Sequence, residues 1–85
     1  MATSDQLKFR IVWKLFHKGC WGKGHLAGRD ICKGLPPEER NACFEALSDL
    51  VRENLVVRKK HEHGDPYRYY LNRHRLGEIR KILGI

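Results

Sequence analysis

Between Pro37 and Leu71 the sequence passes from helical periodicity directly into strand alternation. In PEERNACFEALSDLVREN the apolar residues recur every three or four positions, which is the spacing of one buried helix face. LVVRKK is rich in β-branched residues, YRYYL alternates as a half-buried strand does, and HEHGDP between them contains turn residues. We therefore predict a helix at about 37–53 and strands at about 55–60 and 67–71. A helix that leads straight into a two-stranded ribbon is compatible with few small folds, because its apolar faces must be covered by the rest of the chain.

A second, shorter helix is predicted at about 28–33, just before this stretch. Gly34 followed by Leu35 is typical of a helix end closed by a left-handed glycine and an apolar residue. Pro36 and Pro37 stop that helix and favour the first turn of the next one. Two helices joined by a tight turn with an apolar residue in it have the layout of a helix-turn-helix.

The two ends of the chain are also predicted to be helical. Ser4 is the expected N-cap of a helix at about 5–18, and Gly19 is expected to end it. Asn72 is the expected N-cap of a last helix at about 73–83.

The expected order is completed by a short strand near His25 and Leu26 and by a reversal at Asn54, because asparagine tolerates the left-handed conformation. The 85 residues then form one domain of the α+β class, mostly α.

The segments LSDLVRENLVVRKK and GDPYRYYLNRHRLGEI resemble the winged helix-turn-helix fold. The likeness is closest to bacterial and archaeal transcriptional regulators of the multiple-antibiotic-resistance and phenolic-acid-decarboxylase-repressor types. Their recognition helix ends in a pattern like L-x-x-x-G-L-V, and their wing returns through Y-x-L-T; the counterparts are Leu50–Val56 and Tyr69–Asn72. Asn54 replaces the glycine and Asn72 the threonine, with the same roles in turning and capping. The resemblance implies a three-helix core, a β-hairpin wing and a C-terminal helix.

The resemblance also implies that the helix at 37–53 enters the major groove of DNA while the wing follows the backbone or the minor groove. By position, the base edges would be contacted by Arg40, Asn41 and Phe44, because arginine and asparagine fit guanine and adenine edges and phenylalanine can touch a thymine methyl. The phosphates would be contacted by five basic residues, namely Arg29, Arg58, Lys59, Lys60 and Arg68.

Charge supports a polyanionic partner but is unevenly distributed. The chain has a net charge of +7, which favours nucleic acid or a membrane surface. Residues 37–53 carry five carboxylates and two arginines, so this helix is −3 and the remainder is +10. A duplex repels carboxylates placed against its phosphates. Two functions therefore stay open: a non-catalytic module for double-stranded DNA, as a small transcriptional regulator, or a winged helix that holds a protein partner in a larger assembly.

The first helix is apolar on more than one side. Phe9, Trp13 and Phe16 extend its core-facing stripe, and an apolar surface this broad must be covered by another element or another subunit. Together with the last helix, through Leu76, Ile79 and Leu83, these residues are expected to supply a homodimer interface. Pairing of this kind is a common source of DNA specificity.

Other classes of function find little support. Three unevenly spaced cysteines, Cys20, Cys32 and Cys43, do not indicate a disulfide framework, and we expect the last two to be small core residues in a reducing, cytoplasmic protein. The cysteine and histidine spacings, including His61 and His63, do not match zinc sites, so no metal or cofactor is expected. No run approaches the roughly 20 apolar residues that span a bilayer. No nucleophile elbow or phosphate-binding glycine loop is present, so no enzymatic activity is expected.

Overall fold

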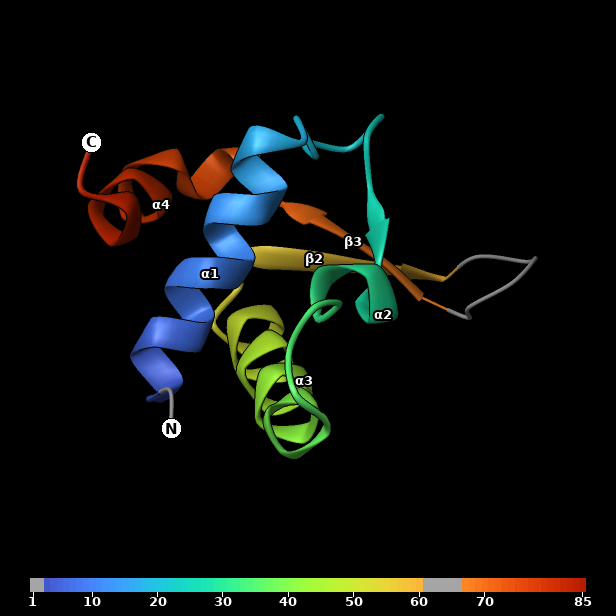
Figure 1. Cartoon of the computed structure of the whole chain (residues 1–85). Coiled ribbons are helices and arrows are strands. Elements are labelled where there is room, and N and C mark those ends of the chain that lie inside the picture. The colour runs from blue at the N-terminus through green and yellow to red at the C-terminus, as the bar shows by residue number, and fades with distance from the viewer. Residues whose placement is uncertain (1–2, 61–66) are drawn as a thin grey trace.

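The computed structural model describes residues 3–60 and 67–85 and has an α+β, mostly helical fold (Figure 1). The helices are α1 (Ser4–His17), α2 (Gly28–Ile31), α3 (Pro37–Arg52), the one-turn 3₁₀ helix η1 (Arg73–Arg75) and α4 (Leu76–Leu83). The strands are β1 (Leu26–Ala27), β2 (Val56–Lys60) and β3 (Tyr67–Leu71). The predicted turn at residues 61–66, with His61 and His63, lies outside the described residues.

The strands form one antiparallel sheet in the order β1-β3-β2. The predicted short strand near His25 and Leu26 is confirmed as β1, which pairs Leu26 with Tyr69. On its other side β3 pairs with β2, and the register places Arg58 opposite Tyr69. We call the antiparallel pair of β2 and β3 the ribbon.

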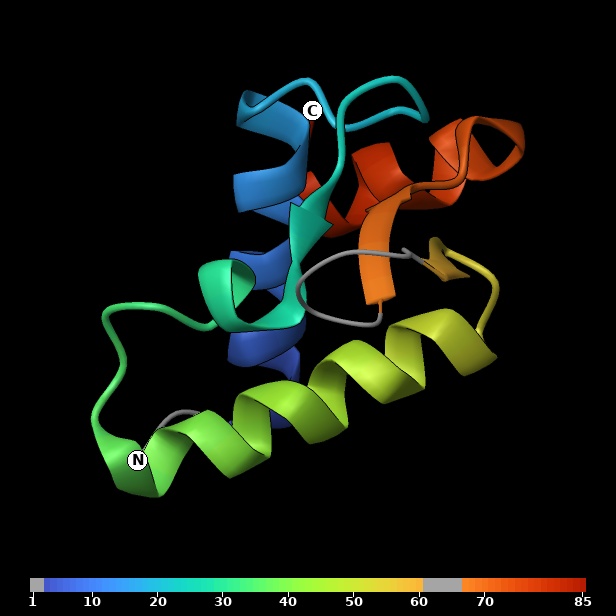
Figure 2. The same ribbon diagram turned by 90° about the vertical axis from the view of Figure 1, so that its right-hand side faces the viewer.

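One core holds these elements together. It is formed by residues that are almost fully inaccessible to solvent in α1, α3, both ribbon strands and α4, including Ile11, Leu15, Leu47, Leu50, Val56, Leu71 and Ile79. Each such side chain contributes on the order of 1.5–3 kcal/mol by leaving water. Figure 2 shows α3 along one side of this core, with α2 and the ribbon next to it and α4 on the opposite side.

The start of α1 corrects the predicted N-cap. The cap is Thr3 and not Ser4: Thr3 Oγ1 accepts a hydrogen bond from Gln6 N at 3.2 Å, and Gln6 Oε1 accepts one from Thr3 N at 2.9 Å. This reciprocal pair is a capping box, which satisfies two N–H groups at once and so moves the helix start forward. Gly19 follows the helix with a φ of +66°, as predicted.

Two predicted helices are shorter or divided. α2 ends at Ile31, because the chain leaves helical geometry at Cys32 and turns through Gly34, where φ is +91°. The helix predicted at about 73–83 consists of η1 and α4, since the dihedral angles of Arg75 (φ −118°, ψ 29°) interrupt it. The cap predicted at Asn72 is confirmed, because its side chain accepts a hydrogen bond from His74 N at 3.1 Å.

Asn54 and Asn72 join the end of α3 to the end of the ribbon. Asn54 has a φ of 65°, so the predicted left-handed reversal is confirmed. The buried side chain of Asn72 donates to the backbone oxygen of Asn54 at 2.8 Å. Its backbone N–H donates to Leu55 O at 2.9 Å. One asparagine therefore bonds both to the start of β2 and to the helix that follows β3.

Replacing Asn72 by alanine is expected to lower the free energy of unfolding by about 1–3 kcal/mol, because buried polar groups would lose their partners. Chemical denaturation followed by circular dichroism measures this change. Asn41→Ala is the matched control, since Asn41 is exposed on α3 and should change stability by no more than about 0.5 kcal/mol. Equal effects of the two substitutions would contradict the assigned role of Asn72.

The cysteines correct a further prediction. Cys32 and Cys43 are buried in the core as expected, but they are bonded to each other in a disulfide, with Cα atoms 6.0 Å apart. The tight turn after α2 reverses the chain direction, so that the end of α2 lies against the second turn of α3. The spacing of the cysteines along the sequence did not reveal this proximity. Cys20 is a free, buried thiol. The cysteine pattern therefore no longer supports a reducing location.

A Cys32→Ser, Cys43→Ser variant is expected to be about 3 kcal/mol less stable than the oxidised chain, because the bond closes a loop of about a dozen residues. Thermal denaturation with and without a dithiol reductant tests this. The reductant should lower the Tm of the original chain and leave that of the variant unchanged. If the Tm of the original chain is the same with and without the reductant, the disulfide does not stabilise the fold.

The predicted dimer surface also changes. Ile79 and Leu83 are buried inside the monomer, so they are not available to a second subunit. Phe16 is half-buried and its ring centroid lies 6.0 Å from that of Trp21. Phe9 and Trp13 remain exposed on α1. Within the part of the chain that the structure describes, no helix is long and apolar enough to cross a membrane.

Candidate nucleic-acid interface

Helix α3 has one buried side and one exposed side. Its buried side consists of Cys43, Ala46, Leu47 and Leu50, whereas Val51 in the last turn is only half-buried. The three predicted base-contacting residues, Arg40, Asn41 and Phe44, are all exposed. Among residues 3–60 and 67–85, the side chains that the resemblance assigned to base contacts therefore keep surface that a ligand can reach.

Arg40 has a structural contact as well. Its Nε donates a hydrogen bond to the backbone oxygen of Leu35 at 3.2 Å. This bond ties the turn between α2 and α3 to the first turns of α3. Because a guanidinium carries five N–H donors in all, Arg40 keeps donors for a ligand after making this bond.

Phe44 lies where α3, α2 and β3 meet. A Cβ atom placed on Gly28 would lie 3.0 Å from Phe44 Cε1 and 3.3 Å from Tyr69 Cε2. Only glycine therefore lets α2 approach the two rings this closely without displacement. We call Gly28, Phe44 and Tyr69 the aromatic junction. The sequence did not predict that Gly28 lets α2 approach these two rings. The only indication in the sequence was that the helix predicted at about 28–33 begins with a glycine.

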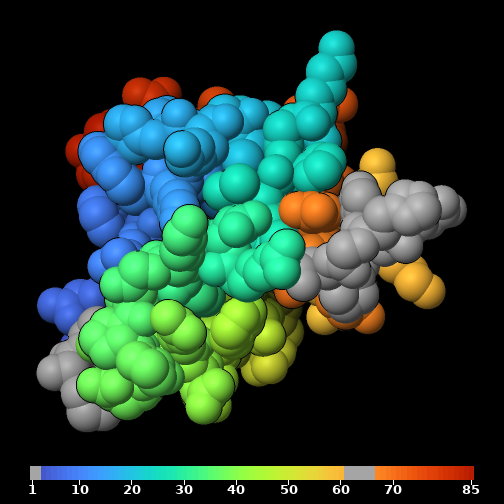
Figure 3. All heavy atoms as spheres, turned by 45° about the vertical axis from the view of Figure 1, so that its right-hand side comes forward, coloured from blue at the N-terminus to red at the C-terminus, as the bar shows by residue number. Residues whose placement is uncertain are grey.

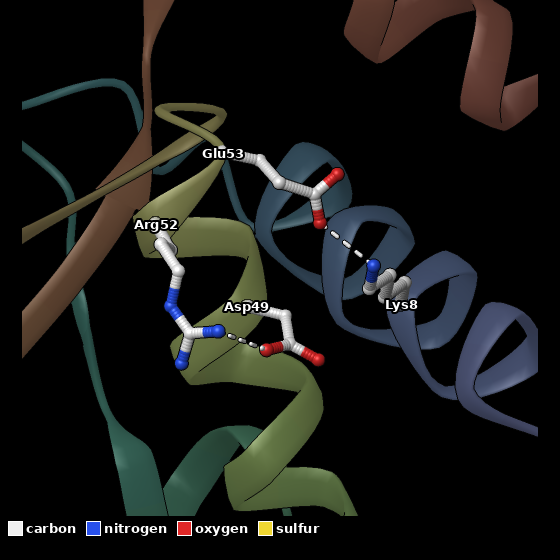
Figure 4. Close-up of polar contacts among 4 residues, drawn as sticks. All are labelled: Lys8, Asp49, Arg52 and Glu53. Atoms are coloured by element: carbon white, nitrogen blue, oxygen red, sulfur yellow. Dashed lines mark hydrogen bonds and ion pairs between the residues drawn. The ribbon is translucent and has the colours of Figure 1, made fainter.

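Two of the five carboxylates of the α3 segment are paired with basic side chains. Glu53 Oε1 accepts a hydrogen bond from Lys8 Nζ of α1 at 2.7 Å, and Asp49 pairs with Arg52 at 3.4 Å (Figure 4). The hydrogen bond that Lys8 donates to Glu53 is the main cause that raises the pKa of Lys8. The edge of α3 next to α1 is thus occupied by ion pairs within the molecule. Exposed pairs of this kind add little stability, but they hold the carboxylates in place.

The cations of the ribbon lie on two different faces. Side chains alternate along a strand, and residues paired across antiparallel strands share a face. Arg58 and Lys60 are on the same face as the buried Leu71, which is the face that packs on the core. Lys59 and Arg68 pair with each other on the opposite face. The five predicted phosphate contacts therefore do not form one surface.

The remaining contacts of the ribbon distinguish these cations further. The guanidinium of Arg58 lies 4.5 Å from the centroid of the Tyr67 ring, a cation–π contact that orders an exposed arginine. Arg68 is half-buried, and its Nε is buried without a hydrogen-bond partner among the residues described. Burial raises the pKa of the Tyr69 hydroxyl, in keeping with a tyrosine that packs against the core.

Exposed cations from three elements surround the aromatic junction. Arg29 follows Gly28 in α2, Arg40 precedes Phe44 by one turn in α3, and Arg58 is the cross-strand partner of Tyr69. Lys60, two residues beyond Arg58, extends this set along the ribbon. We call Arg29, Arg40, Arg58 and Lys60 the basic edge. Figure 3 shows α2, α3 and the ribbon strands together on one face of the molecule.

Within residues 3–60 and 67–85 the structure contains no group of three or more metal-ligating side chains that could hold a metal ion. Comparison of the chain with protein-family models, with curated proteins and with solved structures finds no match. What the basic edge binds is therefore inferred from its own charge and geometry.

Proposed function

We propose that this chain is a winged helix-turn-helix module that binds double-stranded DNA without catalysing a reaction, as a small transcriptional regulator. The observation that carries the proposal is the basic edge: exposed cations of α2, α3 and the ribbon surround one aromatic junction. The order of elements, with two helices joined by a tight turn and followed by an antiparallel ribbon, agrees with the resemblance seen in the sequence.

In this proposal the first half of α3 faces the major groove. Arg40 and Asn41 have the donor geometry for purine edges, and Phe44 offers an apolar contact to a thymine methyl. Arg29, Arg58 and Lys60 bind phosphates, and release of the counterions that these phosphates held drives association.

Two of the five carboxylates of the α3 segment are compatible with this orientation, whereas Glu45 is exposed and lines the same hollow as Phe44. Asp49 and Glu53 belong to the edge that faces α1, where Lys8 and Arg52 pair with them. The duplex would approach from the other edge, where Arg40 and Phe44 lie. Lys59 and Arg68, on the opposite face of the ribbon, are not part of this surface.

The proposal predicts binding to random-sequence duplex DNA whose affinity falls steeply with salt, measured by fluorescence anisotropy. Arg58→Ala with Lys60→Ala should reduce the magnitude of the slope of log K against log salt by about 2, because each lost phosphate contact reduces that slope by roughly 0.9. The control is Arg80→Ala with Lys81→Ala, which removes the same charge from exposed positions on α4.

The control should keep the original slope, because α4 follows the Leu71 end of β3, whereas Lys60 lies at the opposite end of the ribbon (Figure 1). Absence of binding at low salt would reject DNA as the partner. Equal losses in the two variants would mean that net charge alone, and not the basic edge, determines binding.

A second candidate function is a winged helix that holds a protein partner. Phe9 and Trp13 favour it, because they are exposed on α1 and stack at a centroid distance of 6.0 Å with an interplanar angle of 16°. The partner in this case is another protein or a second copy of the chain. Sedimentation as a monomer at high concentration would exclude the second copy.

A further inference from the structure

A second group of cations lies around the turn between α2 and α3. Arg10 of α1 reaches this turn, since a Cβ atom placed on Gly34 would lie 3.8 Å from one of its terminal nitrogens. Lys14, one turn further along α1, donates a hydrogen bond from Nζ to the backbone oxygen of Asp30. Lys33 extends from the turn itself and is exposed.

These cations are close enough to affect one another. The pKa of Lys14 is lowered, first by burial and then by the positive charges of Arg10, Lys18 and Lys33, with partial compensation from Asp30. Mutual repulsion of this kind costs free energy in the unbound protein. A polyanion that binds between the charges removes the repulsion, so the cluster favours an anionic ligand.

The cluster is continuous with the basic edge. A hollow in the surface is lined by residues of α2, the turn and α3, namely Arg29, Asp30, Cys32, Lys33, Arg40 and Phe44. Two of these residues, Arg29 and Arg40, belong to the basic edge, and Lys33 belongs to the turn. The disulfide between Cys32 and Cys43 fixes the residue before Lys33 to α3. The cations of the turn are therefore held in a constant position relative to α3.

The turn and the ribbon lie on different sides of α2. Figures 1 and 2 both show α2 between the turn at residues 32–36 and the β2 and β3 strands. A duplex has two backbones bordering its major groove, which is about 12 Å wide. The turn leads into the start of α3, the helix that is proposed to enter this groove, and the ribbon follows the end of α3. Cations in the turn and in the ribbon therefore match two such backbones better than they match one.

We propose that Arg10 and Lys33 form a second phosphate-binding surface. In one DNA duplex, the ribbon contacts the backbone of one strand and this second surface contacts the backbone of the other strand. This inference rests on the proposed function and adds to it residues that the resemblance to winged helices did not indicate. Lys14 does not belong to this surface but stabilises it, because its Nζ donates a hydrogen bond to the backbone oxygen of Asp30.

Arg10→Ala with Lys33→Ala tests the surface in the same salt titration on random duplex DNA. The slope of log K against log salt should fall by about 2, and binding at 0.1 M salt should weaken roughly 10- to 100-fold. Combination with Arg58→Ala and Lys60→Ala should lower the slope by about 4, since separate contacts add. Arg10→Lys with Lys33→Arg keeps both charges and should keep the slope, and circular dichroism checks that each variant folds.

The outcomes separate this inference from the proposed function. If the original chain does not bind duplex DNA, both are wrong. If the ribbon variant lowers the slope while Arg10→Ala with Lys33→Ala behaves like the α4 control, the second surface is wrong and the proposed function stands. If Arg10→Lys with Lys33→Arg lowers the slope as much as the alanine variant does, the second surface is also wrong, because the charge of these residues would then not be the cause of the lowered slope.

Discussion

The close approach of α2 to α3 and β3 at Gly28 is the contact on which the candidate surface depends. Because Gly28 has no side chain, the rings of Phe44 and Tyr69 lie against its backbone. That contact brings Arg29, Arg40 and Arg58, which come from three elements, around one junction. A larger residue at Gly28 would require the rings of Phe44 and Tyr69 to shift by a few tenths of an ångström.

Two further connections keep this junction in place. The disulfide joins the end of α2 to α3, and Asn72 bonds to the reversal that leads from α3 into β2. The two cysteines and the side chain of Asn72 are buried. The ribbon and α2 are thereby held to opposite ends of α3, so that their cations have defined positions relative to that helix.

The distribution of charge follows from the same packing. The net charge of α3 suggested that the helix would be repelled by phosphates, yet its two edges differ. Glu53 is bonded to Lys8 of α1 and Asp49 to Arg52 on one edge, whereas Arg40 occupies the other. What a charged helix can bind depends on which edge faces outward and on which charges are already paired within the molecule.

The sequence alone determined the kind and order of the elements, the left-handed turn at Asn54, the cap at Asn72 and the exposure of Arg40, Asn41 and Phe44. These features depend on helix and strand periods and on the conformational preferences of single residues, which are local properties. Only the tertiary structure decided that Cys32 bonds to Cys43, that Ile79 and Leu83 are buried, and that Arg58 and Lys59 face opposite ways. These outcomes depend on strand register and on the packing of segments distant along the chain, which no local pattern contains.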